Sequence, residues 1–340
     1  MNADIGAQLW WIGAGVALLS VDVATGNQLE DGVGWGCWDH RGQGTQFHRE
    51  VDMAAKILVV GATGNVGGGV VEALVGEGAD VRGLARNEGS VDAVRAAGCE
   101  PALGDLSEPS SLDGAFDGID VAVVVTRGLE NQVEMAANAI DAAQRAGVGR
   151  IVRSSAFVPE PALDTILGRQ HHEIDQLVRD SGVPYTIVKP TFFMQNIMGA
   201  AQTVAEDGVM YWPFGDGRAG MTDVRDVVDV VAEVASSEGH DGATYTLTGP
   251  ASISMHDVAA AFTAALDKPV SYVDVPVEAA IGPMVEMGMS QFMAETFGEL
   301  FVNFANNGAD RVTDDVEKVT GHAARSIADF ARDFAGMFGG

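Results

Sequence analysis

Three glycines directly after an apolar segment are the residues of this sequence whose type and spacing most clearly suggest chemistry. They stand at positions 61, 64 and 67, after the β-rich run 56–60 and before a segment whose apolar residues repeat at helical spacing. A strand, a tight turn and a helix in this order direct backbone N–H groups and the positive helix end at an anion. The pattern predicts a loop that holds the diphosphate of a dinucleotide, although glycines also end strands for structural reasons alone. We expect this loop to bind its ligand through Gly61, Thr63, Gly64, Asn65, Val66 and Gly67.

The end of the next predicted strand indicates which dinucleotide the loop would bind. A site for NAD usually carries an acidic residue about 20 residues past the glycines, to accept a hydrogen bond from the ribose. The 2′-phosphate of NADP instead favours a guanidinium. This sequence has Arg86 and Asn87 at that strand end and no acid. NADP(H) is therefore favoured over NAD(H), with Arg86 as the phosphate clamp; the alternative is an ordinary surface arginine.

Residues at the ends of later strands complete the predicted cofactor site. Asp105 would accept a hydrogen bond from the adenine amino group, while Leu106 packs on the ring. Ligands of such sheets lie at the carboxyl edge, so residues that end or follow the fourth and fifth strands are expected there too. These residues are Thr126, Arg127 and Ser154.

An acidic composition restricts the partners. The 340 residues carry 48 acidic and 20 basic side chains, which gives a net charge of −28. Such a surface repels the phosphates of nucleic acids and anionic lipids, so neither a nucleic-acid nor a membrane partner is expected. The composition also fits a halophilic organism, because carboxylates stay hydrated when salt screens their repulsion. The alternative is an ordinary acidic enzyme.

The two cysteines indicate the compartment and raise the question of a metal. Cys37 and Cys99 form no spaced framework, which fits a reducing, cytoplasmic interior. Cys37 lies near His40 and His48, but one thiol and two histidines in a glycine-rich stretch are a weak ligand set. No metal site is expected.

The chain divides into three parts. Residues 1–52 hold four of the five tryptophans and show no clear helix or strand period, so we expect an atypical extension, disordered or non-native. From residue 53 strands and helices alternate, which predicts an α/β fold with a Rossmann-like, doubly wound parallel sheet. We expect this core over 53–200 and a smaller, mostly helical substrate region over 201–340, from which a strand at 244–248 returns to the core sheet. The core strands are predicted at 56–60, 80–85, 101–103, 120–125, 150–154 and 185–189, and helices at 65–77, 89–97, 131–146, 168–181 and 222–235.

Motifs spread along the chain occur together in a known family. They are the glycine motif, the Arg86-Asn87 pair, Gly104-Asp105-Leu106, the block 184–196, Asp223-Val-Arg-Asp226, the segment 245–250 and the tail 313–321. Together they resemble the NmrA-like branch of the atypical short-chain dehydrogenase/reductases, which includes quinone reductases, dye-reducing enzymes and redox-sensing regulators. The resemblance implies hydride transfer from NAD(P)H to a quinone-like or other conjugated small-molecule acceptor. It leaves open a non-catalytic NADP(H)-binding redox sensor, and a homodimer is open too, since short-chain folds often pair through helices.

The residues that would act on a substrate are less clearly marked. The Tyr-x-x-x-Lys pair of most short-chain enzymes has no match, and His171 stands where many relatives carry a lysine, four residues before Asp175. A histidine can act as an acid near neutral pH, so His171 is the catalytic candidate, although a solvated helix face is the favoured interpretation of His171 and His172. The acceptor is expected against an apolar wall with one polar anchor, Asn196; core packing is the alternative for two of the aromatic residues. The predicted wall is Phe157, Phe192, Phe193, Met194, Met198 and Trp212.

Overall fold

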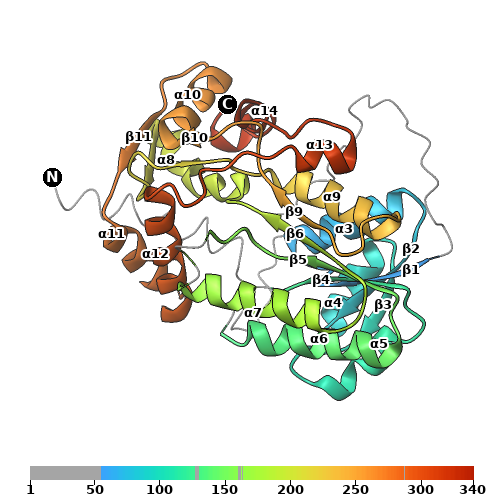
Figure 1. The fold of residues 1–340 in the computed structure, drawn as a ribbon. Helices are drawn as coiled ribbons and strands as arrows, with labels where there is room; N and C mark the ends of the chain where they lie inside the picture. The colour runs from blue at the N-terminus through green and yellow to red at the C-terminus, as the bar shows by residue number, and fades with distance from the viewer. Residues whose placement is uncertain (1–54, 127–129, 160–161, 163, 287) are drawn as a thin grey trace.

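A seven-stranded parallel sheet forms the centre of the protein. The structure, a computed structural model, describes residues 55–126, 130–159, 162, 164–286 and 288–340. The strands stand in the order β3-β2-β1-β4-β5-β6-β9, and every neighbouring pair is parallel. Figure 1 shows this sheet between layers of helices. The strands are β1 (Lys56–Val60), β2 (Asp80–Ala85), β3 (Glu100–Leu103), β4 (Val121–Val125), β5 (Arg150–Ser154), β6 (Tyr185–Pro190) and β9 (Thr244–Leu247).

Alternating side chains of the strands enter two separate cores. Ile57 and Val59 of β1 face one side of the sheet, and Leu58 and Val60 face the other, because successive strand residues point to opposite faces. Helices α3, α4, α9 and α13 cover the first face, and α5, α6 and α7 cover the second (Figure 1). Burial on both faces explains why the strands read as nearly continuous apolar runs. The helices of this layer are α3 (Asn65–Gly76), α4 (Glu88–Ala96), α5 (Asp113–Phe116), α6 (Gln132–Ala146), α7 (Ile166–Asp180), α9 (Val224–Ser236) and α13 (Asp315–Thr320), with a short 3-10 turn η1 (Pro109–Ser111).

Helices α3 and α9 approach each other closely at a glycine. A Cβ placed on Gly69 would lie 2.6 Å from a methyl carbon of Val228, a distance that real Cβ atoms do not show. A residue without a side chain is therefore needed where α3, which follows the glycine loop, packs against α9.

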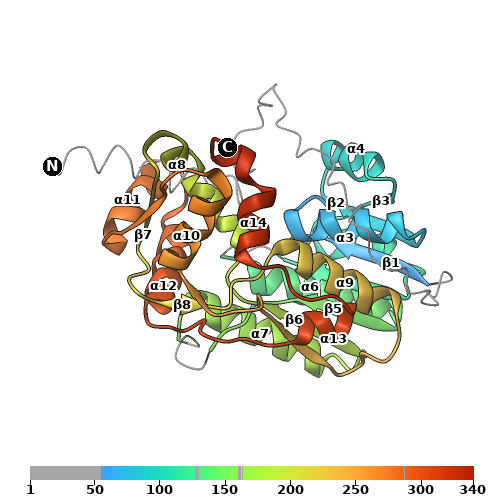
Figure 2. The same cartoon turned by 90° about the horizontal axis from the view of Figure 1, so that it is seen from above.

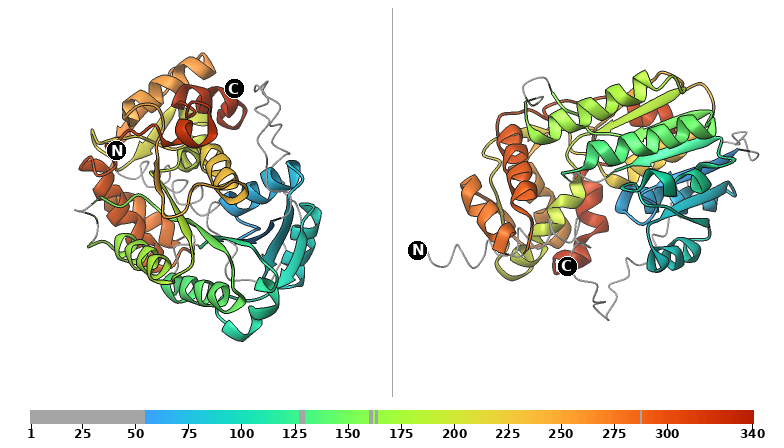
Figure 3. Two further views of the ribbon diagram at one scale, coloured as in Figure 1. Left: turned by 45° about the vertical axis from the view of Figure 1, so that its right-hand side comes forward. Right: turned by 90° about the horizontal axis from the view of Figure 1, so that it is seen from below.

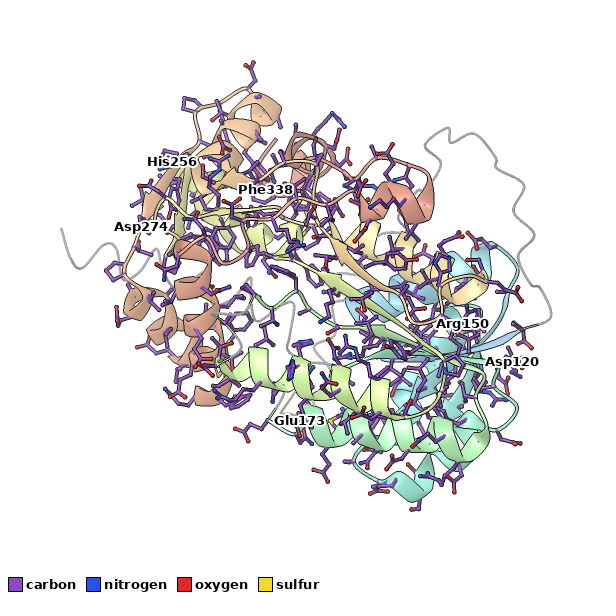
Figure 4. The ribbon with its side chains drawn as sticks, in the orientation of Figure 1. Asp120, Arg150, Glu173, His256, Asp274 and Phe338 are labelled. Carbon is purple, nitrogen blue, oxygen red and sulfur yellow. The ribbon has the colours of Figure 1, made fainter. Side chains whose placement is uncertain are left out.

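A second group of helices lies beyond the carboxyl ends of the strands (Figures 2 and 3). Figure 4 labels Asp120 and Arg150 at the amino ends of β4 and β5, with His256 and Phe338 on the far side in this second group. Two small sheets belong to it, because β7 pairs in parallel with β11 and β8 pairs antiparallel with β10. The elements are η3 (Met194–Ala200), α8 (Ala201–Asp207), β7 (Val209–Trp212), β8 (Arg218–Ala219), β10 (Ile253–Ser254), α10 (Met255–Leu266), β11 (Ser271–Asp274), α11 (Val277–Glu286), α12 (Gln291–Ala305), α14 (Ile327–Asp333) and η4 (Ala335–Phe338).

The predicted architecture is confirmed. The six core strands and the returning strand lie within one residue of their predicted ends, and the order is that of a doubly wound sheet. The four short strands of the second group were not predicted, since two-residue and four-residue strands leave little pattern in a sequence. The prediction for residues 1–52, and with it Cys37, His40 and His48, lies outside the described residues. No helix in the described part of the chain is long and apolar enough to cross a membrane.

A network of charges ties the C-terminal segment to α9. Arg325 contacts the carboxylates of Asp226 and Asp229, and its backbone N–H donates to Asp226 at 2.8 Å. His322 Nε2 lies 3.2 Å from Asp229 Oδ2. The hydrogen bond to Asp229 raises the pKa of His322, although partial burial opposes the shift. The guanidinium supplies the positive charge that these two carboxylates require.

We expect this contact to make stability depend on pH. Because the pKa of folded His322 is raised, its contribution is complete below the pKa of the unfolded histidine, about 6.5, and is lost as the pH rises through the folded pKa. His322→Gln should therefore lower the free energy of unfolding at about pH 5.5. The decrease should be less than about 1 kcal/mol, because the ring is partly exposed, and it should vanish at about pH 9. Urea unfolding at both pH values measures this difference. His172→Gln, on the exposed side of α7, is the control, and an equal effect of His322→Gln at both pH values would contradict the prediction.

Candidate functional site

The turn after β1 has a conformation that only glycines allow. Gly61 has a φ of 82°, in the left-handed region, and a Cβ on it would lie 2.6 Å from the carbonyl oxygen of Val125. A Cβ on Gly67 would lie only 2.2 Å from the carbonyl oxygen of Gly61. The first turn of α3 is thus packed directly on the loop that precedes it.

The start of α3 has backbone donors that no side chain satisfies. Gly64 is the N-cap residue, its backbone is extended, and it offers no side-chain hydrogen bond to the first turn. Such free N–H groups, together with the helix dipole, favour an anion. Thr63 and Asn65 are exposed beside them, whereas Val66 and Gly67 are buried. The predicted loop residues therefore lie together around one helix end that is suited to a phosphate.

This helix end lies at the point where the sheet changes direction. From β1 the chain proceeds to β2 and β3 on one side and then returns to β4 on the other. A crevice forms outside the carboxyl ends of strands at such a switch point, and ligands of α/β sheets bind there. Thr126 follows β4 and accepts a hydrogen bond from the buried Gln132 at 3.2 Å. Arg127 lies outside the described residues.

The structure brings Arg86 and Asp105 near each other at the ends of β2 and β3. Burial raises the pKa of Asp105, but hydrogen bonds from Ser107 and the charge of Arg86 outweigh it and leave that pKa below its usual value. Arg86 is exposed, and Asn87 caps α4 by accepting a hydrogen bond from the Ser90 N–H at 2.9 Å. Leu106 is buried beside them. An exposed guanidinium and a half-buried carboxylate thus flank the side of the crevice next to β2.

Five polar side chains, four of them buried and one partly buried, form a cluster between α7 and the ends of β5 and β6. We call it the α7 polar cluster, and it consists of Arg153, Ser155, His171, Asp175 and Lys189. Lys189 Nζ lies 2.7 Å from Asp175 Oδ2, and Ser155 Oγ lies 3.3 Å from His171 Nδ1. Arg153 is fully buried and donates to the carbonyl oxygens of Val124 and Ser154, while its Nε and Nη2 atoms have no protein hydrogen-bond partner among the described residues.

The cluster keeps His171 neutral. Burial lowers the pKa of His171, and the charges of Arg153 and Lys189 lower it further, to about 3. The predicted solvated position of His171 is wrong, since only 8% of the residue is exposed, whereas His172 is exposed as predicted. At neutral pH the ring of His171 can therefore donate one hydrogen bond and accept one, but it does not supply a proton as an imidazolium.

Helical spacing alone could have placed His171 on the buried face of α7. His171 stands three residues before Ile174 and seven before Val178, both fully buried, so it belongs to the inner face of α7. Glu173 lies on the exposed side of the helix (Figure 4). A lysine within the apolar run of β6 was the corresponding signal for Lys189. The grouping of these side chains was not predicted, because they come from one helix and two strands.

A pocket lies next to this cluster, between the start of α7 and α12. Phe157, two residues after Ser155, forms part of its wall, and its contact with a substrate stays a prediction. Leu167, Thr296, Glu299, Leu300 and Asn303 are other lining residues. The Oε2 atom of Glu299 accepts a hydrogen bond from the N–H of Ile166 at 2.6 Å, which joins α12 to the start of α7.

The other predicted substrate residues occupy different positions. Trp212 is 1% exposed, stacks on Phe214 with 5.2 Å between ring centroids, and is not among the residues that line this pocket. Phe193 and Asn196 are half-buried after β6, where Phe193 pairs with Thr222 in an isolated bridge. Phe192, Met194 and Met198 belong to the core of the second group. Substrate contact by these residues stays a prediction, which the burial of Trp212 does not favour. Ser154, predicted to contact the cofactor, is buried at the end of β5.

Comparison with known proteins extends these observations. The model of the NmrA-like family matches residues 53–332. An NAD(P)H azoreductase of Xenophilus azovorans is 38% identical over 283 residues, which are 83% of this chain and 99% of the azoreductase. A (4-alkanoyl-5-oxo-2,5-dihydrofuran-3-yl)methyl phosphate reductase of Streptomyces griseus is 33% identical, over 83% of this chain and 99% of the relative. In fold the chain is similar to the NADPH-dependent quinone oxidoreductase of Escherichia coli, solved with NADPH, with a TM-score of 0.74, 24% identity, and coverage of 82% of this chain and 99% of that one.

Because the loop is closely packed, one methyl group added at Gly67 should change the affinity for the cofactor. Gly67→Ala should weaken binding of NAD(P)H at least about tenfold, because its Cβ would push the first turn of α3 away from Gly61 and misdirect the N–H groups. Calorimetric titration measures the affinity, and circular dichroism confirms folding. Gly76→Ala in the same helix is the matched control, since among the described residues no atom beyond its chain neighbours and the backbone of its own helix would lie within 4 Å of its Cβ. Equal affinities of Gly67→Ala and Gly76→Ala would show that the loop does not carry the binding.

Proposed function

Since the chain belongs to the NmrA-like family, we propose that it is an NAD(P)H-dependent oxidoreductase that transfers a hydride to a quinone-like or other conjugated small molecule. The observation that carries the proposal is the placement of the glycine loop, the α7 polar cluster and the pocket at one edge of the sheet. Relatives that the chain covers almost completely are named as reductases, one of an azo compound and one of a phosphate-bearing unsaturated ring.

The residues at the crevice fit a nicotinamide dinucleotide. The glycine loop and the free donors of α3 would hold the diphosphate, and the half-buried Asp105 would receive the adenine amino group. The exposed Arg86 supports a preference for NADP(H) over NAD(H), because its fork of donors suits the 2′-phosphate. When bound, the reduced nicotinamide supplies the hydride.

In the reaction, the protein's own side chains would mainly orient the acceptor and stabilise the charge that it gains. Phe157 and the residues of α12 would hold a flat acceptor in the pocket and limit its contact with water. The α7 polar cluster carries two cations against one carboxylate, so its net positive charge favours the negative charge that the acceptor gains with the hydride. With its Nδ1 towards Ser155 as acceptor, neutral His171 would keep its proton on Nε2 and donate there. The proton that completes a hydroquinone comes from water.

A second function is a redox sensor that binds NADP(H) without turnover. The observation in its favour is the neutral state of His171, which leaves the cluster without an imidazolium to act as acid near neutral pH. In this case the pocket would receive a partner's segment or no ligand. A cytoplasmic location, adaptation to concentrated salt and a homodimer are further proposals that rest on the composition and the family.

Oxidation of NADPH in the presence of quinones and azo dyes tests the proposed activity. Turnover should be seen with several conjugated acceptors, and kcat should change by less than about twofold between about pH 5.5 and 8.5, because a group with a pKa of about 3 does not titrate there. Assays in dilute buffer and in about 2 M KCl compare the salt-adapted and ordinary acidic interpretations.

The outcomes of this assay separate the two functions. Tight NADPH binding without turnover of any acceptor would support the sensor. A step in kcat with a midpoint near about 6.5 would contradict the neutral role of His171. Activity that is highest in dilute buffer would remove the salt-adapted interpretation.

The preference for NADPH depends on one guanidinium in this proposal. Arg86→Ala should raise the Kd for NADPH about tenfold or more and leave that for NADH within about twofold, since a charge-assisted contact to phosphate contributes about 1.5–3 kcal/mol. Fluorescence titration with both nucleotides gives the ratio. Arg95→Ala is the control, because Arg95 is also exposed but pairs with Asp92 at 2.7 Å. If the ratio of the Kd values for NADPH and NADH is unchanged in Arg86→Ala, Arg86 is an ordinary surface arginine and does not bind the 2′-phosphate.

A further inference from the structure

An arginine from the C-terminal part of the chain lies against a ring that lines the pocket. The guanidinium carbon of Arg311 lies 5.5 Å from the centroid of the Phe157 ring, in the geometry of a cation–π contact. Phe157 itself lines the pocket between α7 and α12. The cation therefore lies against the same ring that the acceptor would touch, while the arginine is exposed to solvent.

Arg311 carries a positive charge in a protein that has a large excess of acids. The chain carries 48 acidic and 20 basic side chains, yet Arg311 has no carboxylate partner among the residues that the structure describes. The carboxylate of the neighbouring Asp310 accepts a hydrogen bond from the hydroxyl of Ser252 at 2.5 Å and does not pair with Arg311. Glu299, the acid of the pocket wall, is bound by the first N–H of α7, where the helix dipole offsets its charge. No described carboxylate therefore competes with a ligand for the positive charge of Arg311.

The backbone around Arg311 is held in place from two sides. A Cβ on Gly220 would lie 2.0 Å from the Arg311 carbonyl oxygen, so the chain after β8 packs directly against this segment. Gly220 donates to the carbonyl oxygen of Ala309 at 3.1 Å, and Thr313 donates to Thr248 Oγ1 at 2.9 Å. A long side chain on an anchored backbone loses less freedom when it binds a ligand.

From these contacts we infer that Arg311 selects acceptors that carry an acidic group. A sulfonate, carboxylate or phosphate on a conjugated acceptor would pair with the Arg311 guanidinium, while the flat part of the molecule lies against Phe157. The chemical class is an anionic aromatic or quinonoid compound. This inference rests on the proposed reductase function and names the substrate class of the same pocket.

A pair of acceptors that differ in charge tests the inference. Naphthoquinone sulfonate carries the acidic group, and menadione is uncharged. In Arg311→Met we expect KM for naphthoquinone sulfonate to rise about tenfold, with kcat nearly unchanged, and KM for menadione to change less than about twofold. Arg311→Lys should recover part of the loss, and Arg311→Glu should increase it.

A matched variant separates a local contact from a general loss of charge. Arg179→Met removes one positive charge from the last turn of α7, about 18 Å along the helix from the pocket residues Leu167 and Gly168. It should leave KM unchanged for both acceptors. Measurements at low and high ionic strength add a second criterion, because the Arg311 effect should shrink as salt screens the charge.

The readouts separate this inference from the proposed function. Turnover of both acceptors with the same KM ratio in wild type and Arg311→Met would overturn the inference and leave the reductase function standing. If neither acceptor is reduced, the reductase function fails, and calorimetric binding of naphthalene sulfonate decides the inference instead. A Kd about tenfold higher in Arg311→Met than in wild type supports it, whereas equal values or no binding to wild type overturn it.

Discussion

The contact between the first turn of α3 and the turn after β1 is the constraint on which the rest of the site depends. Without side chains at positions 61 and 67, the helix can start directly on the loop and leave its first N–H groups free. The same turn also touches the carbonyl oxygen of Val125, so it fixes β1 against β4 at the switch point. One helical turn later, Gly69 lets α9 approach. Larger side chains at these positions would disturb the anion site, the sheet and the helix layer together.

The few lysines and arginines of the protein fall into two groups, those that pair with carboxylates and those that do not. Most lysines and arginines of the described chain pair with carboxylates, as expected in so acidic a protein. Arg86, Arg153 and Arg311 are among the cations without a carboxylate ion pair in the described part of the chain. Arg153 is buried beside His171, Arg86 is exposed after β2, and Arg311 is exposed against the ring of Phe157. Because no described carboxylate offsets the charge of such a cation, it can attract an anionic ligand.

The pocket depends on contacts between the two groups of helices. Its walls come from the start of α7 and from α12, and the hydrogen bond between Glu299 and Ile166 joins them. The aromatic core around Trp212, Phe214 and Phe304 supports α12 from behind. Phe157 is held to the end of β6 by its backbone N–H, which donates to the carbonyl oxygen of Pro190 at 2.8 Å. The ring that would face an acceptor therefore stands on the sheet itself.

The sequence by itself determined the features that depend on local spacing. The apolar runs of the strands and the glycine loop follow from neighbours within a few positions, and the structure places them as expected. Only the tertiary structure decided the charge state of His171, because burial lowers its pKa and cations from two different strands lower it further. The same holds for Trp212, which the pairing of β7 with β11 places in the core, and for Arg311, which meets Phe157 from a distant part of the chain. Helical spacing could have placed His171 on the buried face of α7, but its charge and the positions of Trp212 and Arg311 depend on contacts between distant segments, which leave no local pattern.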